Sequence, residues 1–299
     1  MKTRATGKSA AYICAAAITI LTPLLSVTPS KAGNFIGHST PGKPGYAIQF
    51  WPSFSHRSGG ADSAGSFYQL AWFSETGLTG TKRDQFELWL GFNAGYASTT
   101  SGSGDAQWGA TAPQIGFEYY YEVVQPEVEA GKTGHRNWWI SPTLMVNTPN
   151  GNDKSSGFGA GANQFSVAFN INNYIAYDRW QLTISPVSAL YSFENRHKSE
   201  WVNGKQKRLR GGLSLTFADA ALGYRMTDNL SVGIHHQFDV FNSASSDFKR
   251  SERGAVGPSF TYTGFASKGY FMSATLDFDY YNRGTTRSTT LNTWLAKTF

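Results

Sequence analysis

The stretch from residue 84 to residue 93 reads Asp-Gln-Phe-Glu-Leu-Trp-Leu-Gly-Phe-Asn, and its alternation is the clearest structural signal in the chain. Its aliphatic residues and both Phe residues recur at every second position, which puts them on one face of an extended strand. The other face carries Gln85, Glu87, Trp89 and a glycine. The stretch therefore predicts a β-strand with two chemically different faces.

The same period of two recurs along the chain, most clearly at 114–124, 164–172, 230–241 and 270–281. Several of these segments exceed the five or six residues usual in soluble sheets. Together with weaker matches, they predict twelve strands. The expected ranges are 46–55, 66–75, 84–97, 111–124, 136–147, 163–177, 180–193, 211–226, 229–242, 254–264, 269–282 and 287–299.

Alternation alone fits two folds, a soluble β-sandwich and an outer-membrane barrel whose apolar face meets lipid. The connections separate them. Long, Gly- and Ser-rich or charged connections (98–110, 148–163, 194–210) alternate with tight turns (178–179, 227–228, 265–268), and 125–135 is an exception. Long loops on one side and short turns on the other are typical of outer-membrane barrels. We therefore predict an all-β chain, a single antiparallel transmembrane β-barrel of about 12 strands over 46–299, with a secreted soluble sandwich binding protein as an alternative.

The N-terminus reads as a secretory signal peptide over 1–32. Lys2, Arg4 and Lys8 precede an apolar stretch, and Ser30-Lys31-Ala32 has a small-x-small cleavage pattern. The single Cys lies inside this leader, which excludes disulfides and thiolate metal sites in the mature chain. Residues 33–45, rich in Gly and Pro, form either a periplasmic leader to the first strand or a hatch folded into the lumen.

Composition excludes a nucleic-acid partner. The leader contains four of the 26 Lys and Arg residues, so 22 remain against 20 Asp and Glu, a net charge of only +2. Phosphate backbones need a concentrated basic surface. The glycine-rich stretches lack the Lys-Ser/Thr of a phosphate-binding loop. We expect no cofactor and no metal.

The last strand predicts how the chain is assembled. Leu291, Leu295 and the terminal Phe299 share one register, which resembles the C-terminal signal read by the barrel-assembly machinery of Gram-negative bacteria. Lys297 stands where that signal usually has an aromatic residue. The expected location is the outer membrane of a Gram-negative bacterium, among outer-membrane lipids.

Several stretches resemble the phenol-degradation MetA-pathway family of outer-membrane proteins, over roughly 117–299. The resemblance rests on 138–144 with the Gly/Asn/Asp loop after it, on Asp-Ala-Ala-Leu-Gly-Tyr-Arg at 219–225, on 230–233, on Gly257-Pro258 and on the terminal strand. It implies a single transporter-like β-barrel through which small compounds pass, aromatic or hydrophobic ones among them. It carries over no functional residue.

The polar faces supply candidates for the barrel lumen, where charged side chains select the solutes that pass. These candidates are Glu118, Tyr120, Glu122, Arg225, His235, Asp239, Asp277, Asp279 and Tyr281. The alternative is that inward acids and bases pair to brace a closed barrel. The aromatic clusters likewise form either a stacking path for solutes or the interfacial girdle of a membrane barrel.

One outward connection is strongly basic and is a candidate for contact with lipopolysaccharide phosphates. Its residues are Arg196, Lys198, Lys205, Lys207, Arg208 and Arg210. The alternative is a solvated loop.

A barrel enzyme acting on lipids is another alternative, with Ser231, His235 and Asp239 as the nearest set of residues. Ser231 is too far from His235 along one extended strand for direct contact. A serine on a neighbouring strand remains an alternative nucleophile, and we expect no enzyme.

Overall fold

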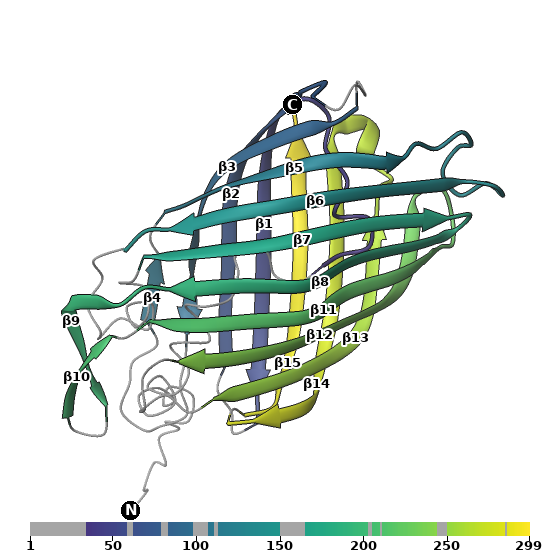
Figure 1. Cartoon of the computed structure of the whole chain (residues 1–299). Coiled ribbons are helices and arrows are strands. Elements are labelled where there is room, and N and C mark those ends of the chain that lie inside the picture. Colours follow the sequence, from purple (N-terminus) through teal and green to yellow (C-terminus); the bar gives the residue numbers. More distant parts are fainter. Residues whose placement is uncertain are drawn as a thin grey trace, which may run out of the picture.

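The computed structural model describes residues 34–58, 62–78, 83–97, 107–110, 113–149, 165–202, 205–209, 211–243, 250–284 and 286–299. The predicted leader, 1–32, and Gly33 lie outside these ranges. The described residues are almost entirely β-strand (Figure 1).

Twelve long strands of the described chain form the wall. They are β1 (Gly45–Arg57), β2 (Asp62–Glu75), β3 (Gln85–Ala97), β5 (Gln114–Val124), β6 (Arg136–Asn147), β7 (Ser166–Tyr177), β8 (Trp180–Ser192), β11 (Gly212–Arg225), β12 (Leu230–Ser243), β13 (Ser251–Tyr262), β14 (Tyr270–Arg283) and β15 (Ser288–Thr298). A short strand, β4 (Gln107–Ala110), pairs with β3 on the same side as β5.

The strands pair antiparallel around a complete circle. β1 pairs with both β2 and the last strand, β15, which joins the two ends of the chain and leaves no free edge. β8 pairs directly with β11, because β9 (Asn195–Val202) and β10 (Lys205–Leu209) form a separate hairpin. The prediction of a closed antiparallel barrel is confirmed. The hairpin was not predicted and lies within the outward connection expected to be a loop.

The two ends of the barrel differ. Tight turns and the C-terminus lie at one end, and the β9–β10 hairpin lies at the other (Figure 1). Asp178, at φ 54°, makes the turn between β7 and β8, and a 3₁₀ helix, Ala266–Lys268, lies between β13 and β14. In outer-membrane barrels the short turns face the periplasm, so we call these ends periplasmic and extracellular.

The outer face of the wall is apolar and the inner face is polar, the reverse of a soluble protein. Leu90 on the outer face is 52% exposed, whereas Glu87 on the same strand is buried. The outer face continues around the wall with Ile48, Phe50, Leu70, Ile115, Phe117, Phe169, Ile171, Ile234, Leu276 and Leu291. An apolar band around a closed barrel with a polar interior is the arrangement of a transmembrane β-barrel. It places the protein in the outer membrane of a Gram-negative bacterium, as the sequence predicted, and excludes the soluble sandwich.

None of the helices among the described residues is long and apolar enough to cross a membrane.

Inside the wall, large rings lie over glycines on the neighbouring strand. The ring of Trp89 covers Gly116, and the ring of Phe67 covers Gly91, so closely that a Cβ atom at either glycine would overlap the ring. Large side chains beside small ones fill the interior of a narrow barrel. The lumen is therefore partly filled by the wall itself.

Candidate functional site

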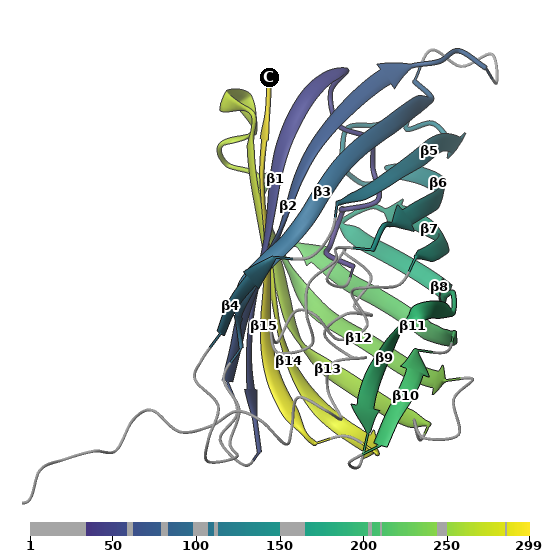
Figure 2. The same ribbon diagram turned by 90° about the vertical axis from the view of Figure 1, so that its left-hand side faces the viewer.

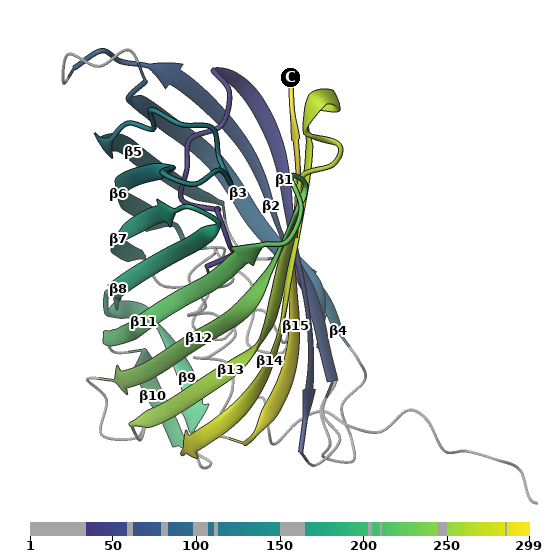
Figure 3. The same cartoon turned by 90° about the vertical axis from the view of Figure 1, so that its right-hand side faces the viewer.

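Residues 34–44 run inside the barrel, where they close much of the lumen. Figures 2 and 3 show this segment, in dark purple, between the opposite walls. Phe35 and Ile36 are completely buried. The sequence allowed either a periplasmic leader or a hatch for these residues, and the structure places them in the lumen. We call residues 34–44 the plug.

Polar side chains of one wall hold the plug backbone. The Asn34 amide N–H donates to Asp219 Oδ1 at 2.9 Å, and its side-chain amide donates to Ser185 Oγ and to the Asp219 carbonyl. The N–H of Gly37 donates to Thr183 Oγ1, and Thr261 Oγ1 donates to the carbonyl of Ile36. None of these contacts belongs to the strand ladder of the barrel.

Aromatic side chains of the opposite wall pack against the plug. The His38 ring contacts Trp51 and Trp294 edge-on, with ring centroids 4.8 and 4.9 Å apart, and Phe35 also packs on Trp51. The side chain of Ile36 fits against the backbone of Gly223 on β11, where a Cβ atom would overlap it. The plug therefore bridges the lumen from β11 to β1 and β15.

A belt of hydrogen-bonded side chains runs along much of the inner wall and includes Asn34 of the plug. On one side, Glu87 accepts from Gln69 at 2.8 Å, from Tyr120 at 2.7 Å and more weakly from Gln49. On the other side, His235 Nδ1 is bonded to Asp277 Oδ1 at 2.8 Å and its Nε2 to Asp219 Oδ1 at 3.0 Å.

Further contacts extend this luminal belt. Asn172 donates to Glu118 at 3.1 Å and accepts from Ser185, and Asn34 joins Ser185 to Asp219. Asn292 donates to Asp277 and accepts from Ser53 on β1. Buried polar groups stabilise a fold only when they are partnered. In the belt, most of the polar groups are partnered by neighbouring strands, although Gln69 Oε1 has no hydrogen-bond partner among the described residues, and the plug takes part through Asn34.

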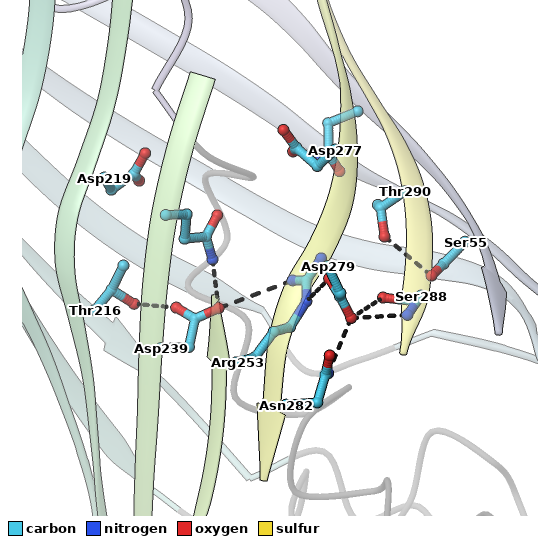
Figure 4. Close-up of polar contacts among 12 residues, drawn as sticks. Ser55, Thr216, Asp219, Asp239, Arg253, Asp277, Asp279, Asn282, Ser288 and Thr290 are labelled. Carbon is cyan, nitrogen blue, oxygen red and sulfur yellow. Dashed lines mark hydrogen bonds and ion pairs between the residues drawn. The ribbon is translucent and has the colours of Figure 1, made fainter. Parts of the chain in front are cut away.

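A separate ion-pair network lies on the extracellular side of the belt (Figure 4). Arg253 Nε is 2.7 Å from Asp279 Oδ1, and Arg253 Nη1 is 3.8 Å from Asp239 Oδ2. Asp239 also accepts from Thr216, and Asp279 also accepts from Ser288. These lumen candidates therefore brace the wall, which is the alternative reading of the inward charges.

The remaining candidates lie nearer the periplasmic end. Glu122 is buried and forms an ion pair with Arg83 at 3.2 Å. Arg225, at the end of β11, lies under the 125–135 turn, where a Cβ atom at Gly131 would meet its stem. The sequence placed this turn on the periplasmic side, and its backbone folds back toward β11.

The predicted position of Tyr281 in the lumen is wrong. Strict alternation predicts that it faces the lumen, but the ring stacks on Phe238 and the hydroxyl donates to Glu252, both on the outer face. The cause is a β-bulge. Gly254 pairs with Tyr281 and the next residue, Ala255, with Asp279, so Tyr280 is the extra residue and both tyrosines point outward.

Several residues of the site were not among the candidates, and the charged ones include Asp219, Arg253 and Glu87. A bulge at Ala218, with φ 46°, breaks the alternation just before Asp219. Arg253 precedes the strand expected at 254. Glu87 lay on a predicted polar face, and its acidity beside Gln85 and Trp89 was the available signal. Asn34 could not be found from strand patterns, because it is outside the strands.

The residues weighed for catalysis have structural partners. Ser231 donates to Gln181 Oε1 at 2.7 Å, and both ring nitrogens of His235 are bonded to belt carboxylates. In the described ranges, no group of three or more His, Cys, Asp and Glu residues is placed to hold a metal ion.

The basic loop residues divide between two strands of the hairpin. Arg196 and Lys198 belong to β9, and Lys205, Lys207 and Arg208 belong to β10. Their backbone is described, but their side chains are not, and Arg210 lies outside the described residues. The hairpin is at the extracellular end (Figure 2).

Comparison with known proteins gives likeness of fold. The chain is similar to the COG4313 outer membrane channel from Pseudomonas putida F1, with a TM-score of 0.65 and 13% identity over 88% of this chain and 98% of that chain. The transport unit of the autotransporter AIDA-I from Escherichia coli gives a TM-score of 0.49 and 9% identity, over 94% of this chain and 98% of that chain. No family model matches the chain, and no curated protein matches its sequence.

Proposed function

We propose that this barrel is an outer-membrane channel or transporter for small compounds, aromatic or hydrophobic ones among them, and that the plug gates it. The carrying observation is a polar lumen, already narrowed by side chains of the wall, that is occupied by a peptide segment outside the strands. The name of the similar structure, an outer membrane channel, supports the proposal. So does the sequence resemblance to the phenol-degradation MetA-pathway family.

The contacts of the plug support a gate. Its hydrogen bonds join it to side chains of the wall, and each is worth about 0.5–1.5 kcal/mol net, because water replaces it on release. Its rings pack on Trp51 and Trp294 without a covalent link. The plug can therefore leave while every pairing between strands stays in place.

The proposal assigns no catalytic step to the barrel. It also keeps two partners predicted from the sequence: lipopolysaccharide at the basic hairpin, and the barrel-assembly machinery at the terminal strand. Leu291, Leu295 and Phe299 are exposed on the outer face, where a docking surface for assembly would have to lie.

Single-channel conductance in planar bilayers tests the gate. We expect rare, brief openings from the complete mature chain and steady conductance, at least several-fold larger on average, from a variant lacking residues 34–44. A variant lacking the tip of the β9–β10 hairpin is the matched control and should behave like the parent. Heat-modifiable migration on gels checks that each variant is folded.

Two results would contradict the proposal. Equal conductance with and without the plug would show that the plug is not a gate. A deletion variant that folds but does not conduct would show that the barrel is not a channel. Brief blockades of the deletion variant by phenol, but not by glycerol, would support aromatic cargo. Equal blockade by both would oppose it.

A further inference from the structure

A cavity of about 230 Å³ lies between the plug and the wall on the periplasmic side of the belt. One side is formed by plug residues, among them Ile36 and Pro41, and the other by side chains of the wall. Exposed turn residues, Asp228 and Asn229, also line it, so it reaches the periplasmic mouth. The cavity is large enough for about ten non-hydrogen atoms at the packing density of protein interiors.

The polar groups at one end of the cavity are already partnered. Glu87 accepts three hydrogen bonds, from Gln49, Gln69 and Tyr120. Gln49 also accepts from the Trp294 indole at 2.8 Å. This end therefore offers a ligand mainly the faces of its rings and few unused hydrogen-bonding groups.

The other end carries donors with capacity to spare. The Arg225 guanidinium has five N–H donors, and within the described ranges its one acceptor is the Asp228 carbonyl, 3.2 Å from Nη1. No described carboxylate makes an ion pair with it. The buried Tyr174 hydroxyl accepts from Gln181 at 3.0 Å, which leaves its own hydrogen available.

The rest of the lining is mixed. Ala47, Phe73, Phe271 and Ala296 lie beside Ile36, and the polar side chains among them are mainly the uncharged hydroxyls of four threonines and Ser231. A guanidinium and a phenol at one end of a chamber that also offers aromatic and aliphatic surface suit an anion with two oxygens and a hydrocarbon body. Resting on the proposed function, we propose that this cavity binds a small organic carboxylate, with its oxygens on Arg225 and Tyr174 and its body against the plug.

Two acidic side chains that line the cavity, Asp228 and Glu87, repel an anion, but neither prevents it from binding. Asp228 is exposed at the mouth, where water screens its charge. Glu87 lies at the opposite end and is hydrogen bonded to three donors. The cation at the end of β11 is therefore the charge that a ligand meets at close range.

Because the plug forms one wall of the cavity, binding is coupled to gating. A ligand that contacts the plug in its seated position stabilises that position and cannot bind in the same way once the plug has left. A carboxylate on the periplasmic side should therefore reduce the frequency of openings. The effect should saturate with the affinity measured for binding.

Isothermal titration calorimetry on the folded, complete mature chain in detergent tests the site. The probes are cyclohexanecarboxylate, the neutral cyclohexanemethanol and the cationic cyclohexanemethylammonium, which share one hydrocarbon body. We expect saturable binding of the carboxylate at least about tenfold tighter than of the other two. Arg225→Gln and Tyr174→Phe should each weaken it, Arg225→Gln by about tenfold or more. Arg179→Gln, a cation at the same end outside the cavity, should leave it unchanged.

Other outcomes overturn the proposal. Equal binding of the neutral probe would mean an apolar cavity without charge recognition, preference for the ammonium would mean that the acidic belt dominates, and absence of binding would remove the site. Since calorimetry does not depend on conduction, binding by a protein that never conducts would retain the site and refute the channel. A protein that conducts but does not bind the carboxylate would retain the channel and refute the binding site.

Discussion

Arg253 shows how single charged residues hold this barrel. Its guanidinium lies between the carboxylates of Asp239 and Asp279, and the Asp279 side chain is completely buried. Removing one member of such a set leaves the others uncompensated in the lumen wall. The loss of stability comes more from the carboxylates left unpaired in the wall than from the lost attraction.

Arg253→Met should therefore lower the free energy of unfolding by about 3 kcal/mol, as expected for a mostly buried pair that loses one partner. Urea unfolding in lipid vesicles measures it. His56→Met is the control, because the ion pair of His56 with Asp62 is exposed on both sides and its loss should cost less than about 1 kcal/mol. Equal losses would show that the network does not brace the wall.

At the scale of the element, strand irregularities decide which side chains enter the lumen. Bulges in β11 and β14 shift the alternation, which brings Asp219 inward and turns Tyr281 outward. β13 and β14 also approach closely at Gly257, where a Cβ atom would overlap the carbonyl of Leu276. The strand geometry thus positions Asp277 against His235.

Gly257→Ala should push β14 away and lower stability by about 1–3 kcal/mol, the range for overpacking. The folded fraction on heat-modifiability gels and urea unfolding both report it. Gly65→Ala in β2 is the control, since its nearest neighbour would be 3.6 Å from the new Cβ. If Gly257→Ala and Gly65→Ala lower the free energy of unfolding by the same amount, the close approach of β14 to Gly257 does not limit the size of the side chain there.

At the scale of the whole molecule, contact with lipid requires the outer face of the wall to be apolar and leaves the polar side chains on the inner face. The outward residues at mid-strand meet hydrocarbon, and those at the strand ends meet headgroups. Leu90 lies in the middle of β3, whereas Tyr46 lies beside the chain terminus, where the Phe299 N–H donates to its carbonyl.

Leu90→Arg should cost about 2–4 kcal/mol in a bilayer, and Tyr46→Arg at most about 1 kcal/mol, because the penalty falls with distance from the midplane. Folding titrations into lipid vesicles measure both. A larger penalty at Tyr46 would place the membrane at another height on the barrel.

The amino-acid sequence by itself determined the class of fold, the strand order and most of the inner face. A period of two is a local property, and it remains readable wherever a strand keeps its alternation, as in 84–93 and 114–124. For the same reason the ranges of most of the twelve strands lie within a few residues of those observed.

Only the tertiary structure decided the position of the plug, the faces of Asp219 and Tyr281, and the pairing of the luminal charges. The plug lacks periodicity, and its place depends on side chains more than 140 residues away, such as Thr183 and Asp219. A bulge is one inserted residue whose cost is set by the neighbouring strand. Hydrogen bonds across the lumen exist only after the barrel has closed, so no local pattern records them.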